Sequence, residues 1–152
     1  MQKQKIYEEV TYRIKLLTQG ETDLIAILST VSCELFHAFD TFHWVGFYRN
    51  VGNNLLKIGP YLGGHGCLTI PYGKGVCGKC ALEKKTQIVT DVNAIENHIA
   101  CSSSTQSEIV LPVFNQQNDL IAVLDIDSNN LNNFDHTDAH YLEKLLLLIN
   151  TL

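Results

Sequence analysis

The chain has 152 residues, of which 45% are hydrophobic and 18% are charged, and its formal net charge is −5. This balance is typical of a globular domain with a hydrophobic core, so we expect a single domain over residues 1–152. The acidic charge and the absence of a basic patch argue against nucleic-acid binding. No apolar run is long enough to cross a bilayer and the N-terminus lacks the apolar core of a secretory signal, so we expect no membrane association and a cytoplasmic location.

Helical spacing of apolar residues predicts two helices at the start of the chain. The first covers residues 3–18 and ends at Gly20. Thr22 is the predicted cap of the second helix. The residues expected on the buried side of this second helix are Ile25, Leu28, Val31 and Phe36. Cys33 lies in the same apolar pattern, and we expect it in the core.

Shorter apolar segments separated by turn residues predict strands in the rest of the chain. The predicted strands cover residues 43–49, 55–59, 67–71, part of 86–92, 107–114 and 119–127. A short helix is predicted at about 76–84, a long loop at 93–106, and a final helix from near Asp135. This order predicts an α+β fold, in which an antiparallel sheet of about six strands carries the N- and C-terminal helices on one face.

The cysteines suggest chemistry, because five of them without a signal peptide indicate a reducing compartment. Four of the five fall in one part of the chain, and these are Cys67, Cys77, Cys80 and Cys101. In one interpretation they bind zinc, since Cys77 and Cys80 have C-x-x-C spacing. A second close pair is missing, although His65 and His98 lie nearby in the sequence, so we expect no metal site.

In the other interpretation one cysteine is a nucleophile and a second cysteine resolves it. The nucleophile must be a thiolate in an exposed, polar site, because an ordinary thiol is mostly protonated at neutral pH. Cys101 lies at the edge of a polar loop in "ENHIACSSSTQSEIVLP" and suits this role. Cys77 lies near the start of a predicted helix, where the helix dipole could lower its pKa. Spacing alone does not choose between Cys101 and Cys77.

Three carboxylates are predicted to lie together on one hairpin. Asp125 and Asp127 alternate around Ile126, so both point to one face of the sheet, and Glu108 begins the partner strand. Clustered carboxylates raise one another's pKa, so at least one of them can stay protonated near neutral pH and donate a proton. The alternative is a solvated strand face without chemistry.

Two aromatic residues are candidates for a wall of the site. Trp44 and Tyr48 alternate on one predicted strand with Gly46 between them, so they share a face of the sheet. By this pattern alone they also fit an ordinary aromatic core. Asp91, in "TDVN", is polar at a strand end and fits either a site or a cap.

Five motifs occur in order along the chain: "FHWVGFY", "CLTIPYGKGVCG", "TDVN", "NHIAC", and "SEIVLP" followed by "VLDIDS". Together they closely resemble the free methionine-(R)-sulfoxide reductases, a family of single GAF domains, and the resemblance runs from about Phe42 to Ser128. It implies thiol-dependent reduction of free L-methionine-(R)-sulfoxide to L-methionine through a cysteine sulfenic acid and an intramolecular disulfide. It also implies recycling by thioredoxin or a similar dithiol, with no metal or organic cofactor.

The resemblance assigns a role to three of the cysteines. It makes Cys101 the nucleophile, Cys67 the chief resolving thiol, and Cys77 an auxiliary that can form an alternative disulfide. His98, in "NHIAC", could favour the thiolate form of Cys101 or serve only in packing the loop.

The resemblance also describes the substrate pocket, with carboxylates that donate a proton and hold the substrate ammonium. The residues at these carboxylate positions are Glu108, Asp125 and Asp127, and the pocket walls are Trp44 and Tyr48. Since no arginine lies in the motifs, we expect the backbone N–H groups of Ile99 and Ala100 to hold the substrate carboxylate. A homodimer is expected by analogy with other GAF domains.

This chain departs from the family pattern at several positions. Lys79 and Cys80 follow "GVCG" where small residues are usual, so a fourth thiol joins the group. Ser102 replaces the usual Asp after the nucleophile, and the loss of this charge favours the thiolate. The segment "GGHGC", which leads to Cys67, differs from the usual family sequence before this cysteine. The rival functions are a stand-alone small-molecule sensor and a peroxide-sensing thiol protein.

Overall fold

The computed structural model describes residues 2–96 and 101–149. Within these residues the α-helices are α1 (Gln2–Leu17), α2 (Leu24–Ala38), α3 (Gly75–Glu83) and α4 (His136–Leu146). The strands are β1 (Trp44–Asn50), β2 (Leu55–Leu62), β3 (Thr69–Pro71), β4 (Gln87–Val89), β5 (Ser107–Phe114) and β6 (Leu120–Ser128), and a 3-10 turn, η1 (Val92–Ala94), follows β4. None of the helices in the described ranges has the length and apolar character needed to span a membrane.

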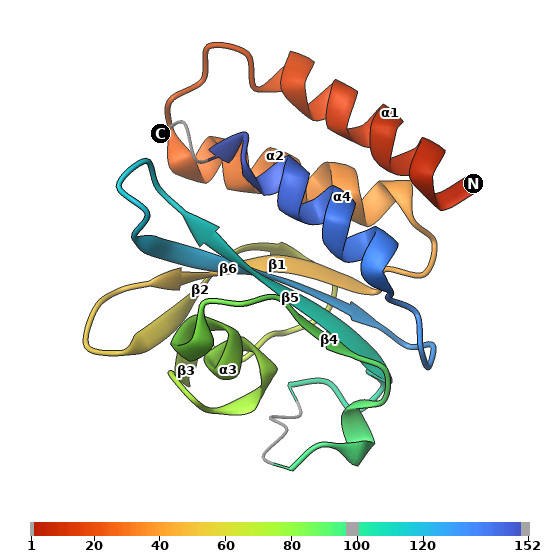
Figure 1. The fold of residues 1–152 in the computed structure, drawn as a ribbon, viewed down its shortest axis with the longest axis vertical. Coiled ribbons are helices and arrows are strands. Elements are labelled where there is room, and N and C mark those ends of the chain that lie inside the picture. The colour runs from red at the N-terminus through yellow and green to blue at the C-terminus, as the bar shows by residue number, and fades with distance from the viewer. Residues whose placement is uncertain (1, 97–100, 150–152) are drawn as a thin grey trace.

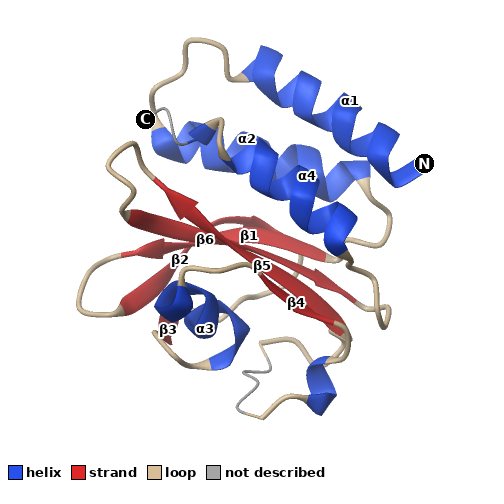
Figure 2. Cartoon of the chain, in the orientation of Figure 1, coloured by secondary structure: helices blue, strands red, loops and turns tan. Residues whose placement is uncertain are grey.

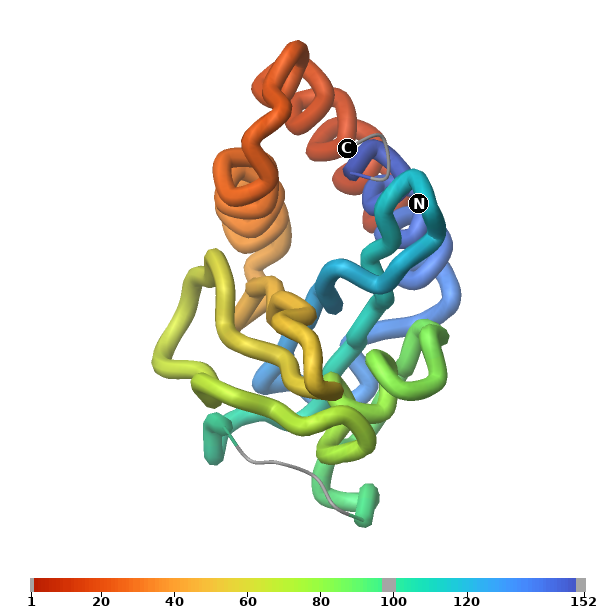
Figure 3. The backbone as a smooth tube through the Cα atoms, turned by 90° about the vertical axis from the view of Figure 1, so that its left-hand side faces the viewer, coloured from red at the N-terminus to blue at the C-terminus, as the bar shows by residue number. Residues whose placement is uncertain are grey.

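The six strands form one antiparallel sheet in the order β3-β2-β1-β6-β5-β4. Helices α2 and α4 pack on one face of the sheet and α1 lies against those two helices, whereas α3 covers the other face (Figure 1, Figure 2). In the view of Figure 3, α1 lies at one end of the molecule and η1 lies near the other. The predicted α+β fold, with its terminal helices on one face, is confirmed.

The sheet separates two hydrophobic cores, because successive residues of a strand point to opposite faces. On β1, Val45 and Phe47 pack in the core beneath the three long helices. Trp44 and Tyr48 belong instead to the smaller core beneath α3. The candidate site residues on β1 therefore lie on the α3 face of the sheet.

The sequence prediction of α2 is wrong in three details. Asp23, not Thr22, caps the helix, because its side chain accepts a hydrogen bond from the backbone N–H of Ala26. Ile25 is 51% exposed. Cys33 is an exposed free thiol and is not in the core. The buried stripe of the helix explains both exposed residues, since it runs instead through Ile27, Leu28, Val31, Ser32 and Leu35.

Candidate active site

The three predicted carboxylates meet on the α3 face of the sheet. Glu108 on β5 is the direct partner of Asp127 on β6, and Asp125 lies two residues earlier on the same strand. Directly paired residues of antiparallel strands point to the same face, and so do alternate residues of one strand. Glu108 and Asp125 are only 6% and 5% exposed, whereas Asp127 is partly exposed. The sheet register therefore holds three acidic groups together with little access to water.

This arrangement raises the pKa of two of the carboxyls well above their usual range. For Asp125 the causes are burial, then the charges of Asp127 and Glu108. For Asp127 they are loss of solvation and the nearby charge of Glu108. Both aspartates also hydrogen-bond to the Glu108 side chain, and a hydrogen bond between two carboxyls requires a proton. The cluster therefore retains a proton at pH values where an isolated aspartic acid is ionised.

One side-chain oxygen of Asp125 has no hydrogen-bond partner among the residues that the structure describes. Its side chain hydrogen-bonds to Glu108 and to the thiol of Cys77. Its Oδ1 atom, however, is buried and has no hydrogen-bond partner among the described residues. A buried acceptor without a donor is costly, and such a group commonly marks a binding site.

The aromatic wall is built on β1. The rings of Trp44 and Tyr48 stack with their centroids 5.8 Å apart, and Tyr61 stacks on Trp44 at 5.3 Å. Gly46 leaves space for this arrangement, because a Cβ atom there would lie 2.6 Å from the Trp44 ring. Burial and the charge of Asp125 raise the pKa of Tyr48, so its hydroxyl remains a hydrogen-bond donor.

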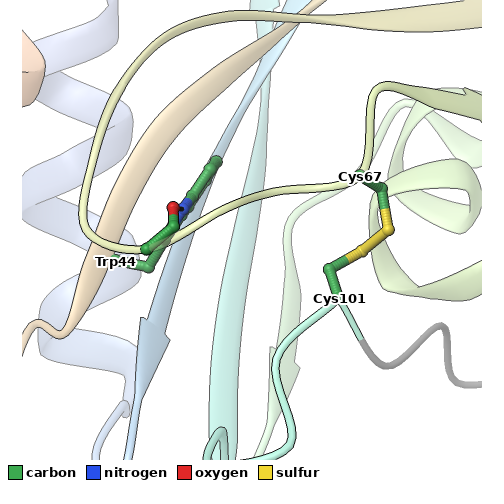
Figure 4. The surroundings of a disulfide bond; sticks show 4 residues. Trp44, Cys67 and Cys101 are labelled. Atoms are coloured by element: carbon green, nitrogen blue, oxygen red, sulfur yellow. Dashed lines mark hydrogen bonds between the residues drawn. A yellow bond between two sulfur atoms is a disulfide. The ribbon is translucent and has the colours of Figure 1, made fainter.

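A disulfide joins Cys67 and Cys101, two residues separated by 34 positions in the sequence. Their Cα atoms lie 5.4 Å apart, an ordinary spacing for a disulfide. Both residues are half-buried, so the sulfurs are not sealed in the apolar core. Figure 4 shows Trp44 beside the loop that leads to Cys67, and its indole nitrogen donates a hydrogen bond to the carbonyl oxygen of Gly64 in that loop at 2.9 Å.

The other two thiols near the site are buried on α3. The expectation that the helix dipole lowers the pKa of Cys77 is wrong, because burial and the charges of Asp125, Glu108 and Asp127 raise it. Burial, with Glu83 and Glu108, also raises the pKa of Cys80. Neither group is a thiolate at neutral pH, so neither suits the role of attacking nucleophile.

A cavity beneath α3 brings most of the predicted site residues together. Those that line it are Trp44, Tyr48, Cys77, Cys101, Glu108, Asp125 and Asp127. Ile99, Ala100 and His98 lie outside the described residues. Asp91 is not in the cavity; it caps η1 by accepting a hydrogen bond from the backbone N–H of Asn93.

The cavity also contains two basic residues, His65 and Lys74. From the sequence, His65 was named only beside a possible zinc site and Lys74 was not identified. Its position directly before the first helical residue of "GKGVCG" is the signal that could have identified it.

A group of side chains near the cavity could serve as metal ligands. Among the residues that the structure describes, Cys77, Glu108 and Asp125 offer ligand atoms within 4.8 Å of one another. This group is not the one that the C-x-x-C interpretation requires, because Cys80 is not part of it and Cys67 and Cys101 are bonded to each other.

The chain and its structure were matched by a domain-family model, by related sequences and by solved structures. A model of the GAF domain matches residues 19–149. The chain is 39% identical to the free methionine-R-sulfoxide reductase of Saccharomyces cerevisiae, over 99% of this chain and 87% of that protein. It superposes with a TM-score of 0.92 on the free methionine-R-sulfoxide reductase of Neisseria meningitidis solved with its substrate, at 41% identity over 97% of this chain and 88% of the other. The reduced Staphylococcus aureus enzyme gives a TM-score of 0.90 at 40% identity, over 95% and 92% of the two chains.

Proposed function

Because the chain belongs to the free methionine-R-sulfoxide reductases, a family of GAF-domain proteins, we propose that it reduces free L-methionine-(R)-sulfoxide to L-methionine. The observation that carries this proposal is the disulfide between Cys67 and Cys101 at a cavity that is also lined by three carboxyl groups and two aromatic rings. Such a cavity combines an oxidisable thiol, a source of protons and an apolar wall. The predicted homodimer and cytoplasmic location stay predictions.

Cys101 is the nucleophile in the proposed reaction. Its thiolate attacks the sulfoxide sulfur, the oxygen passes to Cys101 as a sulfenic acid, and methionine leaves with its sulfur reduced by two electrons. Cys67 then attacks the sulfenic acid, which forms the disulfide and releases water. Thioredoxin or a similar dithiol reduces this disulfide by exchange and restores both thiols. The ordinary Cα separation of Cys67 and Cys101 supports their pairing, and the raised pKa of Cys77 supports Cys101 over Cys77 as the attacking group.

The carboxyl cluster supplies the proton that the sulfoxide oxygen needs before its bond to sulfur can break. The raised pKa values of Asp125 and Asp127 support this role, since they keep a proton on the cluster at pH values where an isolated aspartic acid has lost it. The remaining negative charge of the cluster holds the substrate ammonium. The three residues that share these two roles are Glu108, Asp125 and Asp127.

Trp44 and Tyr48 hold the apolar end of the substrate. Their stacked rings form a wall of the cavity next to the carboxyl groups, which suits the methyl group and the sulfur of methionine sulfoxide. The Tyr48 hydroxyl, kept protonated by its raised pKa, can donate a hydrogen bond to the sulfoxide oxygen. Cys77 remains a predicted auxiliary thiol.

Turnover on the two separated epimers of free methionine sulfoxide tests the proposal. The full chain is supplied with thioredoxin, thioredoxin reductase and NADPH, and NADPH oxidation is followed. We expect oxidation with the R epimer and none with the S epimer. No turnover of either epimer, with ligand binding alone, would favour the sensor function instead.

A further inference from the structure

The two residues of the disulfide have different surroundings. Cys67 packs against the smaller hydrophobic core beneath α3 and lines neither of the two cavities at the site. Cys101 lines both of them, the substrate cavity described above and a second cavity beside it. Exchange of a disulfide begins when a thiolate attacks one of its two sulfurs, and access helps to decide which sulfur is attacked. The surroundings therefore favour attack on Cys101.

The second cavity, the outer groove, is the roomier approach to Cys101. The residues that line it without lining the substrate cavity are His43, Gly64, Ser103, Ser104 and Asn129. In the oxidised chain the substrate cavity has a volume of only about 30 Å³, which is room for one or two water molecules. The outer groove has a volume of about 530 Å³, so it has room for a cysteine side chain together with its neighbours in another protein.

The walls of the outer groove suit a polar partner that approaches closely. Ser102, Ser103 and Ser104 follow Cys101 directly in the sequence, and all three are exposed. Because their side chains are small, they leave the backbone beside Cys101 open to hydrogen bonds from the main chain of a partner. Asn129, directly after β6, is also exposed, and its backbone N–H donates to Nδ1 of His43 at 2.9 Å.

We propose that the dithiol protein that recycles this chain docks at the outer groove and attacks Sγ of Cys101 rather than Sγ of Cys67. This inference rests on the proposed function and extends it to the recycling step. The thiolate of the reductant forms a bond to Sγ of Cys101, the bond between Cys67 and Cys101 breaks, and the Cys67 thiolate that leaves takes up a proton. The second thiol of the reductant then attacks the reductant's own sulfur in the mixed disulfide and releases the thiolate of Cys101. Both electrons come from the reductant, which departs as a disulfide.

The first part of the test identifies the attacked sulfur. A Cys33→Ser chain is oxidised with diamide, so that no substrate is needed and the exposed thiol of Cys33 cannot take over the mixed disulfide. The probe is a thioredoxin whose second active-site cysteine is replaced by serine, which stops the exchange at the mixed disulfide. After an acid quench at the earliest time point, we expect peptide mapping to find the probe on Cys101 and a free thiol at Cys67.

The second part fills the outer groove with larger side chains. The variants are Ser103→Tyr and Asn129→Tyr, and the matched control is Ser29→Tyr, since Ser29 is an exposed serine of α2 that lines neither cavity. Turnover of free L-methionine-(R)-sulfoxide is driven either by thioredoxin with its reductase or by dithiothreitol. We expect both groove variants to lower kcat/KM for thioredoxin about tenfold and to keep the dithiothreitol-driven rate within about twofold, because only the protein reductant needs the groove. Ser29→Tyr should equal wild type with both reductants.

A mixed disulfide on Cys67 would overturn the inference, and so would an unchanged kcat/KM for thioredoxin in both groove variants. An equal loss with thioredoxin and with dithiothreitol would also overturn it, because the groove would then act in the chemistry rather than in docking. A wild-type chain that forms the mixed disulfide but releases no methionine from the R epimer would contradict the proposed function alone, which separates the two failures.

Discussion

The indole nitrogen of Trp44 donates a hydrogen bond to the carbonyl oxygen of Gly64, three residues before Cys67 in the sequence. The wall of the proposed substrate pocket is thereby tied to the loop that carries one half of the disulfide (Figure 4). Because Cys67 is held to Cys101 in the oxidised chain, breaking the disulfide releases the constraint on this loop.

This contact predicts that the fluorescence of Trp44 reports the redox state of the disulfide. Trp44 is the single tryptophan of the chain, so its emission can be read without interference from another indole. We expect its emission maximum to shift when dithiothreitol reduces the wild-type chain, and to stay constant in Cys67→Ser, which cannot form this disulfide. Identical spectra of oxidised and reduced wild type would show that the loop and the indole are not coupled.

Substitutions of the two cysteines of the disulfide should have different effects on turnover. Cys101→Ser is expected to abolish turnover, because the attacking sulfur is lost. Cys67→Ser is expected to release about one methionine per chain in a single turnover but to be recycled slowly by thioredoxin, because the sulfenic acid has no partner thiol. Rapid-quench measurement of methionine checks both variants, and a full rate in Cys101→Ser would remove that residue from the mechanism.

The carboxyl cluster should contribute directly to the rate. Glu108→Gln and Asp127→Asn are each expected to lower kcat/KM at least about tenfold, which corresponds to about 1.4 kcal/mol of activation free energy. Steady-state kinetics with the R epimer measures this loss. Rates equal to wild type in both variants would mean that these carboxyls neither donate the proton nor bind the substrate.

The raised pKa of Asp125 also predicts a pH-dependent cost in stability. Its folded-state pKa lies above its unfolded value, so the folded chain holds a proton that the unfolded chain releases between those two values. Its contribution to the free energy of unfolding is therefore present below the unfolded pKa and is lost as pH rises through the folded pKa.

Asp125→Asn removes this titration and retains the shape of the side chain. We expect the variant to have a higher melting temperature than wild type at pH 8, with a smaller difference at pH 4, measured by circular dichroism. A difference of the same size at both pH values would contradict the linkage, since it would then not arise from the proton.

Much of the site could be predicted from the sequence because it follows strand periodicity. The alternation of Asp125 with Asp127, and of Trp44 with Tyr48, determines which face each side chain occupies once the strands are known. Periodicity could not give the pKa of Cys77, because the dipole of a short helix is outweighed by burial and by carboxyls from two distant strands. A local pattern does not show those tertiary neighbours.

Lys74 was not predicted as a cavity residue for a related reason. Lys74 is unremarkable as one charged residue in a glycine turn, and its place in the cavity depends on how α3 packs on the sheet. The exposure of Cys33 depends likewise on which face of α2 packs against the sheet and α1.

The most direct test of the central claim is a single turnover of the fully reduced chain with one equivalent of free L-methionine-(R)-sulfoxide, followed by mapping of disulfides in its peptides. The predicted result is about one methionine released for each Cys67–Cys101 disulfide formed, and neither product with the S epimer. Release of methionine while the thiols of Cys67 and Cys101 both stay open to alkylation would contradict it.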